Sequence, residues 1–359
     1  MRRKIKTCVL HIGTEKTGTT TLQAHLALNR DTLLERGFMV PICLSPYRKL
    51  ANHERLTTYA LRPEKIDDDL RVAARLISST QIDDHRAKIL SDLQRETENI
   101  SAVIETLLLS NEHCHSRLVE EDEVALLKEL LSEFAEDFKI VVYLRPQHEL
   151  AVSLYTQALK AGHFNIGVLP QFSSGKKLWV NKRYFDYFDL INRWSSIFGV
   201  ENIIVRIYSE HDLINGNVID DFFKVINCDQ TDLQIPVNHN VGMPKDAQAV
   251  LNAFNRFAYD YPEEVTPQLR GQLIKALESL PQGAGVRPSR IEAEGFFRMF
   301  EDSNQKVRQL FFPDRDRLFF PNFDRFPDEA PAPLAEADSI IRTVIRLVTV
   351  NRAINASQQ

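Results

Sequence analysis

The sequence predicts an α/β protein with a doubly wound, mainly parallel sheet. Four short runs, at about 6–12, 103–109, 139–144 and 203–208, are almost entirely apolar, which is typical of parallel strands buried on both faces. Helical patterns separate these runs, and strands that alternate with helices form this class of sheet. Ligands of such sheets bind outside the carboxyl ends of the strands. We therefore expect functional residues in the segments that directly follow the strands.

The helices between the strands are predicted from apolar residues at helical spacing. One helix covers about 19–35, and a broken helical stretch covers roughly 63–98. A third pattern, at 119–136, places an apolar stripe among acidic residues, and a fourth helix begins near Gln147. The segment 163–184 is polar and rich in glycine and aromatic residues, so we expect a long loop that serves as a lid or substrate wall.

The last third of the chain is predicted to be helical from about residue 244. A breaker-rich linker at 327–333 precedes a final amphipathic helix at 334–353. We expect an α/β core over 1–240 and a helical C-terminal region over 241–359, packed on the same domain. The aromatic residues expected in its core are Phe254, Phe257, Phe296, Phe297 and Phe300.

The composition excludes several classes of function. The 359-residue chain has a formal net charge of −5 and no long basic run, so nucleic acid is not an expected partner. Its four cysteines form no C-x-x-C pair, and their spacing suggests neither a disulfide framework nor a zinc site. The chain enters a strand almost at once, and no run of about 18 apolar residues occurs. We expect no metal, no membrane span and a cytoplasmic location.

A loop that carries a lysine joins the first predicted strand to the first predicted helix. The strand stops at Gly13, Gly18 follows five residues later, Lys16 lies between them, and a helical pattern begins at Thr19. Backbone N–H groups in such a loop, together with the positive end of the helix, form a binding site for phosphate, and Lys16 adds a cation. The chain is therefore expected to open with a nucleotide-phosphate site.

The order of residues separates this loop from the P-loop of nucleoside triphosphatases. In the pattern G-x-x-x-x-G-K-[ST], the lysine directly follows the second glycine and reaches the β- and γ-phosphates. Here Thr19 follows Gly18, and Lys16 comes two residues before that glycine. The pattern argues against an ordinary ATPase or GTPase.

A second candidate anion site follows the third predicted strand. That strand ends in Arg145-Pro146, and a helical stretch begins at Gln147. Arg145 at the strand end and Ser153 two turns into the helix are eight residues apart, so both can face one anion. Arginine offers a planar fork to phosphate oxygens, and serine adds a neutral donor.

Both segments resemble the cofactor-binding signatures of sulfotransferases that use 3′-phosphoadenosine 5′-phosphosulfate (PAPS). The run E-K-T-G-T-T-T-L resembles their 5′-phosphosulfate loop, P-K-[ST]-G-T-[ST]-[ST]-L, with Glu15 where many relatives have proline. The run from Arg145 to Ser153 resembles their 3′-phosphate signature, an arginine after a strand and a serine eight residues later. A weaker match at 203–213 resembles the segment whose tyrosine lies near the adenine, and it points to Tyr208.

The resemblance implies PAPS as the sulfuryl donor on a P-loop-like α/β core. It is strongest over residues 7–25, 103–115 and 138–162, and it is closest to bacterial sulfotransferase-like proteins. The residues that it assigns to the cofactor are Gly13, Thr14, Lys16, Thr17, Gly18, Thr19, Thr20, Arg145, Ser153 and Tyr208.

The implied reaction needs stabilisation of the leaving group and a base near the acceptor. Lys16 fits the first role, because it can approach the bridging oxygen. Relatives use a glutamate or a histidine as the base. Glu112, after the second strand, is the first candidate, and His113 is the alternative. Only one of the two is expected to face the site, because successive side chains of a strand point to opposite faces. His53, after the first helix, is a third candidate. Unlike phosphoryl transfer from Mg-ATP, the scheme requires no metal.

Two other functions stay open on the sequence. A small-molecule kinase of the P-loop type would need Mg-ATP and an aspartate at a strand end, whereas the predicted second and third strands end in Ser110-Asn111-Glu112 and Arg145. A non-catalytic nucleotide-binding protein of the same fold would bind the cofactor without turnover. The acceptor is expected to carry a hydroxyl group, as a carbohydrate or small molecule does, but neither its identity nor the oligomeric state can be derived from the sequence.

Overall fold

The computed structural model describes residues 3–98, 100–172, 180–236, 242–280, 283–329 and 340. The chain divides into two units that interleave along the sequence. The first unit comprises Met1–Arg145, Asp186–Asn238 and Asp302–Phe319, and the second comprises Pro146–Phe185, His239–Glu301 and Phe320–Gln359. Segments from both sides of residue 240 enter each unit, so the units do not follow the single boundary expected there.

The first unit contains a five-stranded parallel sheet in the order β2-β3-β1-β4-β5, which confirms the α/β class. Its strands are β1 (Ile5–His11), β2 (Phe38–Met39), β3 (Thr106–Ser110), β4 (Ala135–Leu144) and β5 (Ile203–Ile207). β1 lies in the middle, where Leu10 pairs with Leu109 of β3 and with Ile140 of β4, and all three side chains are fully buried. This burial on both faces explains the continuous apolar runs.

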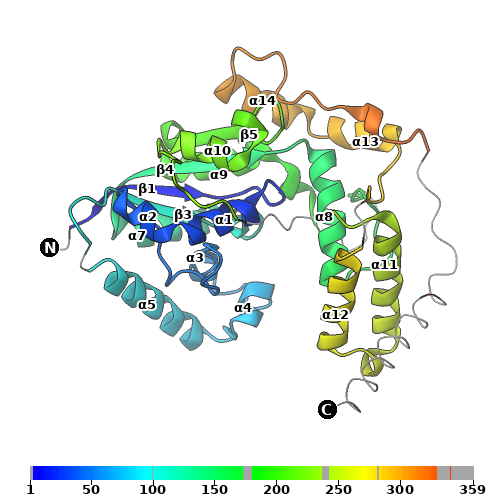
Figure 1. Cartoon of the computed structure of the whole chain (residues 1–359), viewed down its shortest axis with the longest axis horizontal. Coiled ribbons are helices and arrows are strands. Elements are labelled where there is room, and N and C mark those ends of the chain that lie inside the picture. The colour runs from blue at the N-terminus through cyan, green and yellow to red at the C-terminus, as the bar shows by residue number, and fades with distance from the viewer. Residues whose placement is uncertain are drawn as a thin grey trace. The chain divides into compact units, whose positions relative to one another are not determined.

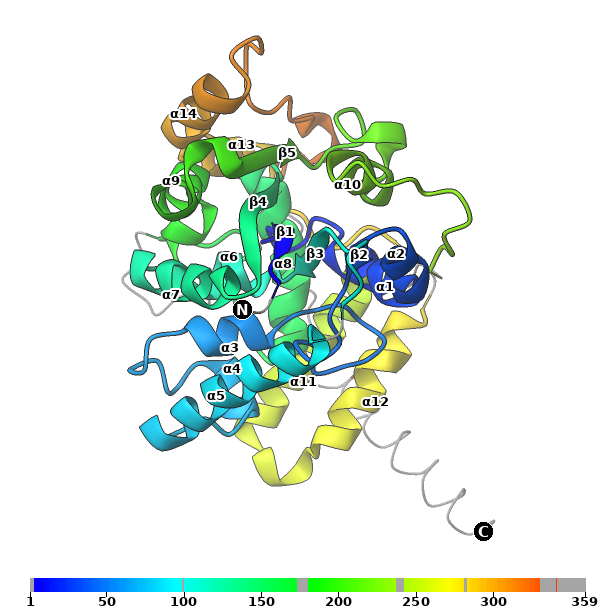
Figure 2. The same ribbon diagram turned by 90° about the vertical axis from the view of Figure 1, so that its left-hand side faces the viewer.

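Helices cover both faces of this sheet (Figure 2). On one face, α1 (Thr19–Leu28), α2 (Arg30–Glu35) and α10 (Val218–Val225) share a core with β1 and β4. On the other face, α7 (Glu121–Ser132) packs against α9 (Tyr187–Phe198). Trp194 is fully buried there and stacks on Phe198 with ring centroids 5.7 Å apart.

The shorter elements of the first unit refine the expected boundaries. The helix expected at 19–35 is broken at Asn29, and the one expected at 119–136 ends at Ser132, because β4 begins at Ala135. The stretch expected at 63–98 forms two helices, α4 (Asp69–Ala73) and α5 (Ser79–Glu96), and α3 (Arg55–Ala60) precedes them. The remaining helices of this unit are α6 (His113–Arg117) and α14 (Glu301–Phe311), and α14 begins one residue before the boundary of the unit.

The second unit is helical. Its helices are α8 (Gln147–Ala161), α11 (Lys245–Asp260), α12 (Pro267–Glu278) and α13 (Arg290–Arg298). α11 packs against both α8 and α12 (Figure 1) around a core that includes Phe254 and Leu159. Phe296 and Phe300 are buried as expected, whereas Phe257 and Phe297 are only partly buried.

Two expected segments lie wholly or partly outside the described residues. The final helix expected at 334–353 is described only at residue 340, and the linker expected at 327–333 only at 327–329. Within the expected loop at 163–184, the described residues contain no α-helix after α8. The short 3₁₀ turns are Lys182–Phe185, Val200–Asn202, Ile214–Gly216, Pro262–Glu264 and Phe323–Arg325. No described helix combines the length and the apolar character needed to cross a membrane.

Candidate functional site

The lysine loop lies at the point of the sheet where the strand connections diverge. β1 and β4 are neighbours, but the chain leaves β1 toward β2 at one edge and leaves β4 toward β5 at the other. Such a divergence opens a crevice outside the carboxyl ends of the two strands, which is where doubly wound sheets bind ligands. The residues that follow β1 and β4 are the lysine loop and Arg145.

Hydrogen bonds to β4 close the lysine loop. Tyr143 donates its N–H to the oxygen of Gly13 at 2.7 Å, and Thr14 donates its N–H to the oxygen of Tyr143 at 3.0 Å. Gly13 has φ +104°, and a Cβ there would lie 3.3 Å from the Cα of Glu112. Lys16 and Gly18 also adopt positive φ, at 63° and 79°. Glycine is therefore required where the loop passes Glu112 and where it enters the helix.

The loop ends at a helix start that has the features of an anion site. Gly18 is the N-cap of the ten-residue α1, and it has no side chain to cap the helix. The first intrahelical bond is from Leu22 N–H to Gly18 O at 3.0 Å, so the N–H groups before it, including those of Thr19 and Thr20, have no intrahelical acceptor. These donors and the positive end of the helix favour a bound anion.

Two threonines of the loop use their hydroxyl groups internally. Thr17 Oγ1 donates to the oxygen of Thr14 at 2.6 Å, and Thr14 Oγ1 donates to the oxygen of Tyr143 at 3.0 Å. Both side chains are fully buried. The hydroxyl hydrogens of these two threonines therefore stabilise the loop.

Arg145 and Tyr208 lie beside the loop. Arg145 Nη1 donates to the oxygen of Lys16 at 3.2 Å, and its Cζ lies 5.8 Å from the centroid of the Tyr208 ring. A Cβ at Gly18 would lie 3.4 Å from that ring. Four predicted residues from the ends of three strands thus gather at one place. Ser153 lies on α8 in the other unit and is partly buried, and its pairing with Arg145 stays a prediction.

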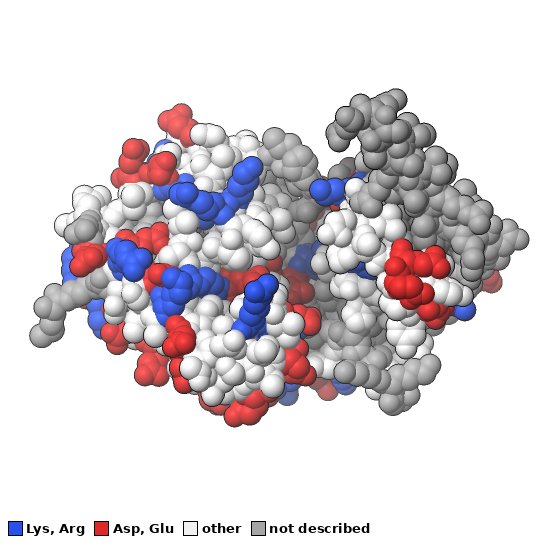
Figure 3. Space-filling view, turned by 90° about the horizontal axis from the view of Figure 1, so that it is seen from below, with Lys and Arg blue, Asp and Glu red and all other residues white. Residues whose placement is uncertain are grey.

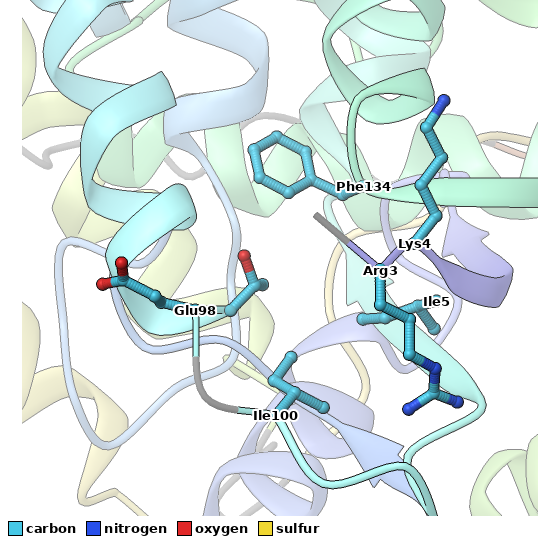
Figure 4. Close-up of a pocket in the computed structure, with 7 residues that line it drawn as sticks. Arg3, Lys4, Ile5, Glu98, Ile100 and Phe134 are labelled. Carbon is cyan, nitrogen blue, oxygen red and sulfur yellow. The ribbon is translucent and has the colours of Figure 1, made fainter. Parts of the chain in front are cut away.

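A cavity of about 620 Å³ adjoins Tyr208. The segment that follows β5 lines it, with Tyr208, Ser209, Glu210, His211, Leu213, Asn215 and Gly216. A volume of this size is within the range of small-molecule sites. By contrast, the cavity at the amino ends of the strands, beside Ile5 and Phe134, measures about 50 Å³ and has room for little more than water (Figure 4).

A buried ionic network supports the segment that carries Tyr208. Asp221 is fully buried and accepts hydrogen bonds from Arg206 Nε at 2.8 Å, Arg206 Nη2 at 2.5 Å and Tyr143 Oη at 2.8 Å. It also accepts the N–H of Ile214 at 3.3 Å. Asp221 therefore ties β4, β5 and the wall of the cavity together. Sequence reasoning missed it, because its partners come from distant segments.

Two carboxylates lie near His113, the residue that follows Glu112. His113 Nδ1 lies 3.8 Å from Glu15 Oε1, and His113 Nε2 lies 3.9 Å from Glu54 Oε2. Burial raises the pKa of Glu54, His113 acts against this, and Glu112 raises the pKa further. Glu112 and His113 therefore belong to one group with Glu54. Glu54 is a further candidate for the base. Sequence reasoning missed it, although it directly follows His53.

His53 does not have the environment of a base. It is fully buried, its Nδ1 accepts the N–H of Ser110 at 2.9 Å, and its Nε2 lies 3.1 Å from the oxygen of Pro41. Burial lowers its pKa to about 3. Both nitrogens hold backbone groups, so His53 fixes the end of β3. These contacts favour a structural role for His53 over the predicted role of a catalytic base.

On the face of the described residues that Figure 3 shows, basic and acidic side chains are interspersed. Within the part of the chain that the structure describes, no group of three or more histidine, cysteine, aspartate or glutamate residues is placed to hold a metal ion.

Comparisons with known proteins return few similarities. No family model matches the chain. An uncharacterized protein of Archaeoglobus fulgidus is 27% identical over 210 residues, which are 55% of this chain and 54% of that protein. The chain thus spans about half the length of the curated relative that it matches.

Two solved structures are similar to this chain. A sulfotransferase from Alicyclobacillus acidocaldarius is 12% identical with a TM-score of 0.40, over 76% of this chain and 97% of that one. A sulfotransferase domain from the curacin biosynthetic pathway is 14% identical with a TM-score of 0.34, over 64% and 76% of the two chains. Similarity this weak assigns no function, which has to come from the chain's own residues.

Proposed function

We propose that this protein is a sulfotransferase that moves a sulfuryl group from PAPS to a hydroxyl group of a carbohydrate or small-molecule acceptor. The observation that carries the proposal is the lysine loop at the start of α1, at the divergence of β1 and β4, with Arg145 bonded to the oxygen of Lys16. The displaced lysine disfavours a triphosphate, and an arginine next to the loop suits a second phosphate group.

In this proposal the loop and the neighbouring segments bind different parts of PAPS. The N–H groups at the start of α1 and the ammonium of Lys16 hold the 5′-phosphosulfate. Arg145 binds the 3′-phosphate, with Ser153 added from its spacing in the sequence alone. Tyr208 and the cavity of about 620 Å³ beside it have room for the nucleoside.

The reaction forms a bond between the acceptor oxygen and sulfur while the bond from sulfur to the bridging phosphate oxygen breaks. Lys16 stabilises the negative charge that develops on the departing phosphate, because a preplaced cation favours the transition state over the ground state. The acceptor hydroxyl loses its proton to Glu112, whose backbone lies against Gly13. His113 and Glu54, which lie near each other in the same group, set the charge around it.

Calorimetric titration with 3′-phosphoadenosine 5′-phosphate (PAP) tests the proposal. We expect PAP to bind at least tenfold more tightly than ADP, which lacks the 3′-phosphate. Release of PAP from PAPS is expected to persist in EDTA. No binding of PAP, or equal affinity for PAP and ATP, would refute the proposed function.

A further inference from the structure

A buried glutamine connects the helix of the lysine loop to Glu112. Gln23 lies on α1, one turn after the helix starts, and is 1% exposed. Its Nε2 donates a hydrogen bond to Glu112 Oε2 and lies 3.4 Å from Ser110 Oγ. Ser110 Oγ lies 2.9 Å from His11 Nδ1, and both residues are fully buried. A row of buried polar groups thus runs from β1 to Glu112.

The amide of Gln23 has no evident purpose in packing. Its neighbours on the buried side of α1, Leu22 and Leu26, are fully buried apolar residues of the core. A buried amide costs free energy unless its polar atoms are hydrogen-bonded, so leucine would serve this position better if only packing mattered. The bond to Glu112 gives the amide a role that leucine could not fill.

The geometry around Glu112 shows what the bond holds in place. The Cα of Glu112 lies 3.3 Å from where a Cβ of residue 13 would be, so Glu112 adjoins the loop. Gln23 donates to one carboxylate oxygen of Glu112, Oε2, and so fixes this carboxylate beside the loop.

We propose that Gln23 is a positioning residue for the proposed sulfuryl transfer, holding Glu112 in register with the lysine loop. The loop helix and the base then form one rigid piece, so the acceptor oxygen and the donor sulfur are brought to a fixed separation. Positioning of this kind matters, because a displacement of about 1 Å can reduce a rate about a hundredfold. The inference rests on the proposed function.

The structure supports Glu112 more directly than the other base candidates. His113 contacts Glu15 and Glu54 at 3.8 and 3.9 Å, which are too long for hydrogen bonds. Glu112 has a donor that is buried and that is itself part of a hydrogen-bonded row. Preorganisation by a buried partner distinguishes a catalytic group from a surface carboxylate.

The test compares Gln23→Met with Leu26→Met. Methionine at position 23 has a similar length but no donor, and Leu26 lies one turn further along the same helix, in its core. Release of PAP from PAPS, with water as the acceptor, gives kcat and the KM for PAPS. We expect Gln23→Met to lower kcat about tenfold while the KM for PAPS stays within threefold, because a positioning residue acts on the chemical step and not on binding of the donor. Leu26→Met should change neither.

A double-mutant cycle separates positioning from a general loss of structure. In a Glu112→Gln background, Gln23→Met is expected to cost no further activity, because the group that it positions is already disabled. Gln23→Asn keeps the amide but is one methylene too short, and it should show the same loss with less disturbance of the core. PAP affinity should stay within threefold in every variant.

Three results would overturn the inference. Wild-type kcat in both Gln23 variants would refute it, as would a loss that adds fully to that of Glu112→Gln. A lowered kcat together with a comparable rise in the KM for PAPS would assign Gln23 a structural role. Failure of the wild-type protein to bind PAP is a separate outcome, which refutes the proposed function and with it the inference.

Discussion

Replacing Gly18 by alanine is expected to disturb the start of α1 for two separable reasons. Gly18 has φ +79°, a conformation that costs a residue with a Cβ about 1–2 kcal/mol. The added Cβ would also lie 2.8 Å from Val218 Cγ1, and overpacking of a core costs about 1–3 kcal/mol. We therefore expect Gly18→Ala to lower the free energy of unfolding by about 2–5 kcal/mol, measured by urea denaturation.

The two contributions are separated by a second substitution at Val218. Val218 is 7% exposed, so Val218→Ala by itself should cost about 2 kcal/mol in lost burial. In the double variant the close contact is relieved while the backbone cost stays. The double variant should therefore be about 1–3 kcal/mol more stable than the sum of the single effects predicts.

Gly271 provides the matched control. It lies inside α12, where nothing is within 4 Å of an added Cβ, so Gly271→Ala should stabilise the protein by about 0.5–1 kcal/mol.

The Gly18→Ala variant should also bind PAP at least tenfold more weakly, because the N–H groups at the helix start shift. A Gly18→Ala protein with unchanged stability and unchanged PAP affinity would refute the proposed geometry of the loop.

Three further predictions concern charge. Burial lowers the pKa of His11 and of His53 to about 3, from 6.5. The unfolded chain therefore binds more protons than the folded chain below pH 6.5. The free energy of unfolding should fall by about 1.4 kcal/mol per pH unit for each histidine as the pH drops toward 3. His53→Gln should reduce this slope, whereas the control His211→Gln, at an exposed position, should not change it. Asp221→Ala leaves Arg206 without its buried partner and should cost about 3–5 kcal/mol in urea denaturation, whereas Asp220→Ala, next to it and less buried, should cost under about 1 kcal/mol. Lys16→Met should reduce PAPS turnover about a hundredfold or more while PAP still binds, and full activity in that variant would contradict the role of the lysine.

The fold class and the loop could be predicted because their signals are local. Continuous apolar runs identified four of the strands, and the glycines that bracket Lys16 marked the loop between β1 and α1. β2 escaped prediction, since a strand of two residues has no periodicity to detect. The break at Asn29 was also missed, because asparagine inside a helical pattern is only a weak stop signal.

The group around Glu112 could be predicted only in part, because its members come from segments far apart in the sequence. Gln23 and Glu112 are separated by 89 residues, and nothing in either segment indicates that they meet. The surroundings of His53 could not be predicted for the same reason. A histidine after a helix suggests chemistry in a sequence, but only the fold shows that backbone groups of Pro41 and Ser110 occupy both its nitrogens.

The threonines of the loop show how neighbouring residues of one type take different roles. Thr14 and Thr17 donate their hydroxyl hydrogens to backbone oxygens and are fully buried, whereas Thr19 and Thr20 form the first turn of α1, where backbone N–H groups have no intrahelical acceptor. Closure of the loop therefore comes from these hydroxyl bonds and from the two bonds between Gly13, Thr14 and β4. None of these bonds involves the side chain at position 15. The shape of the loop therefore does not depend on proline at this position, and the carboxylate of Glu15 lies 3.8 Å from His113 Nδ1.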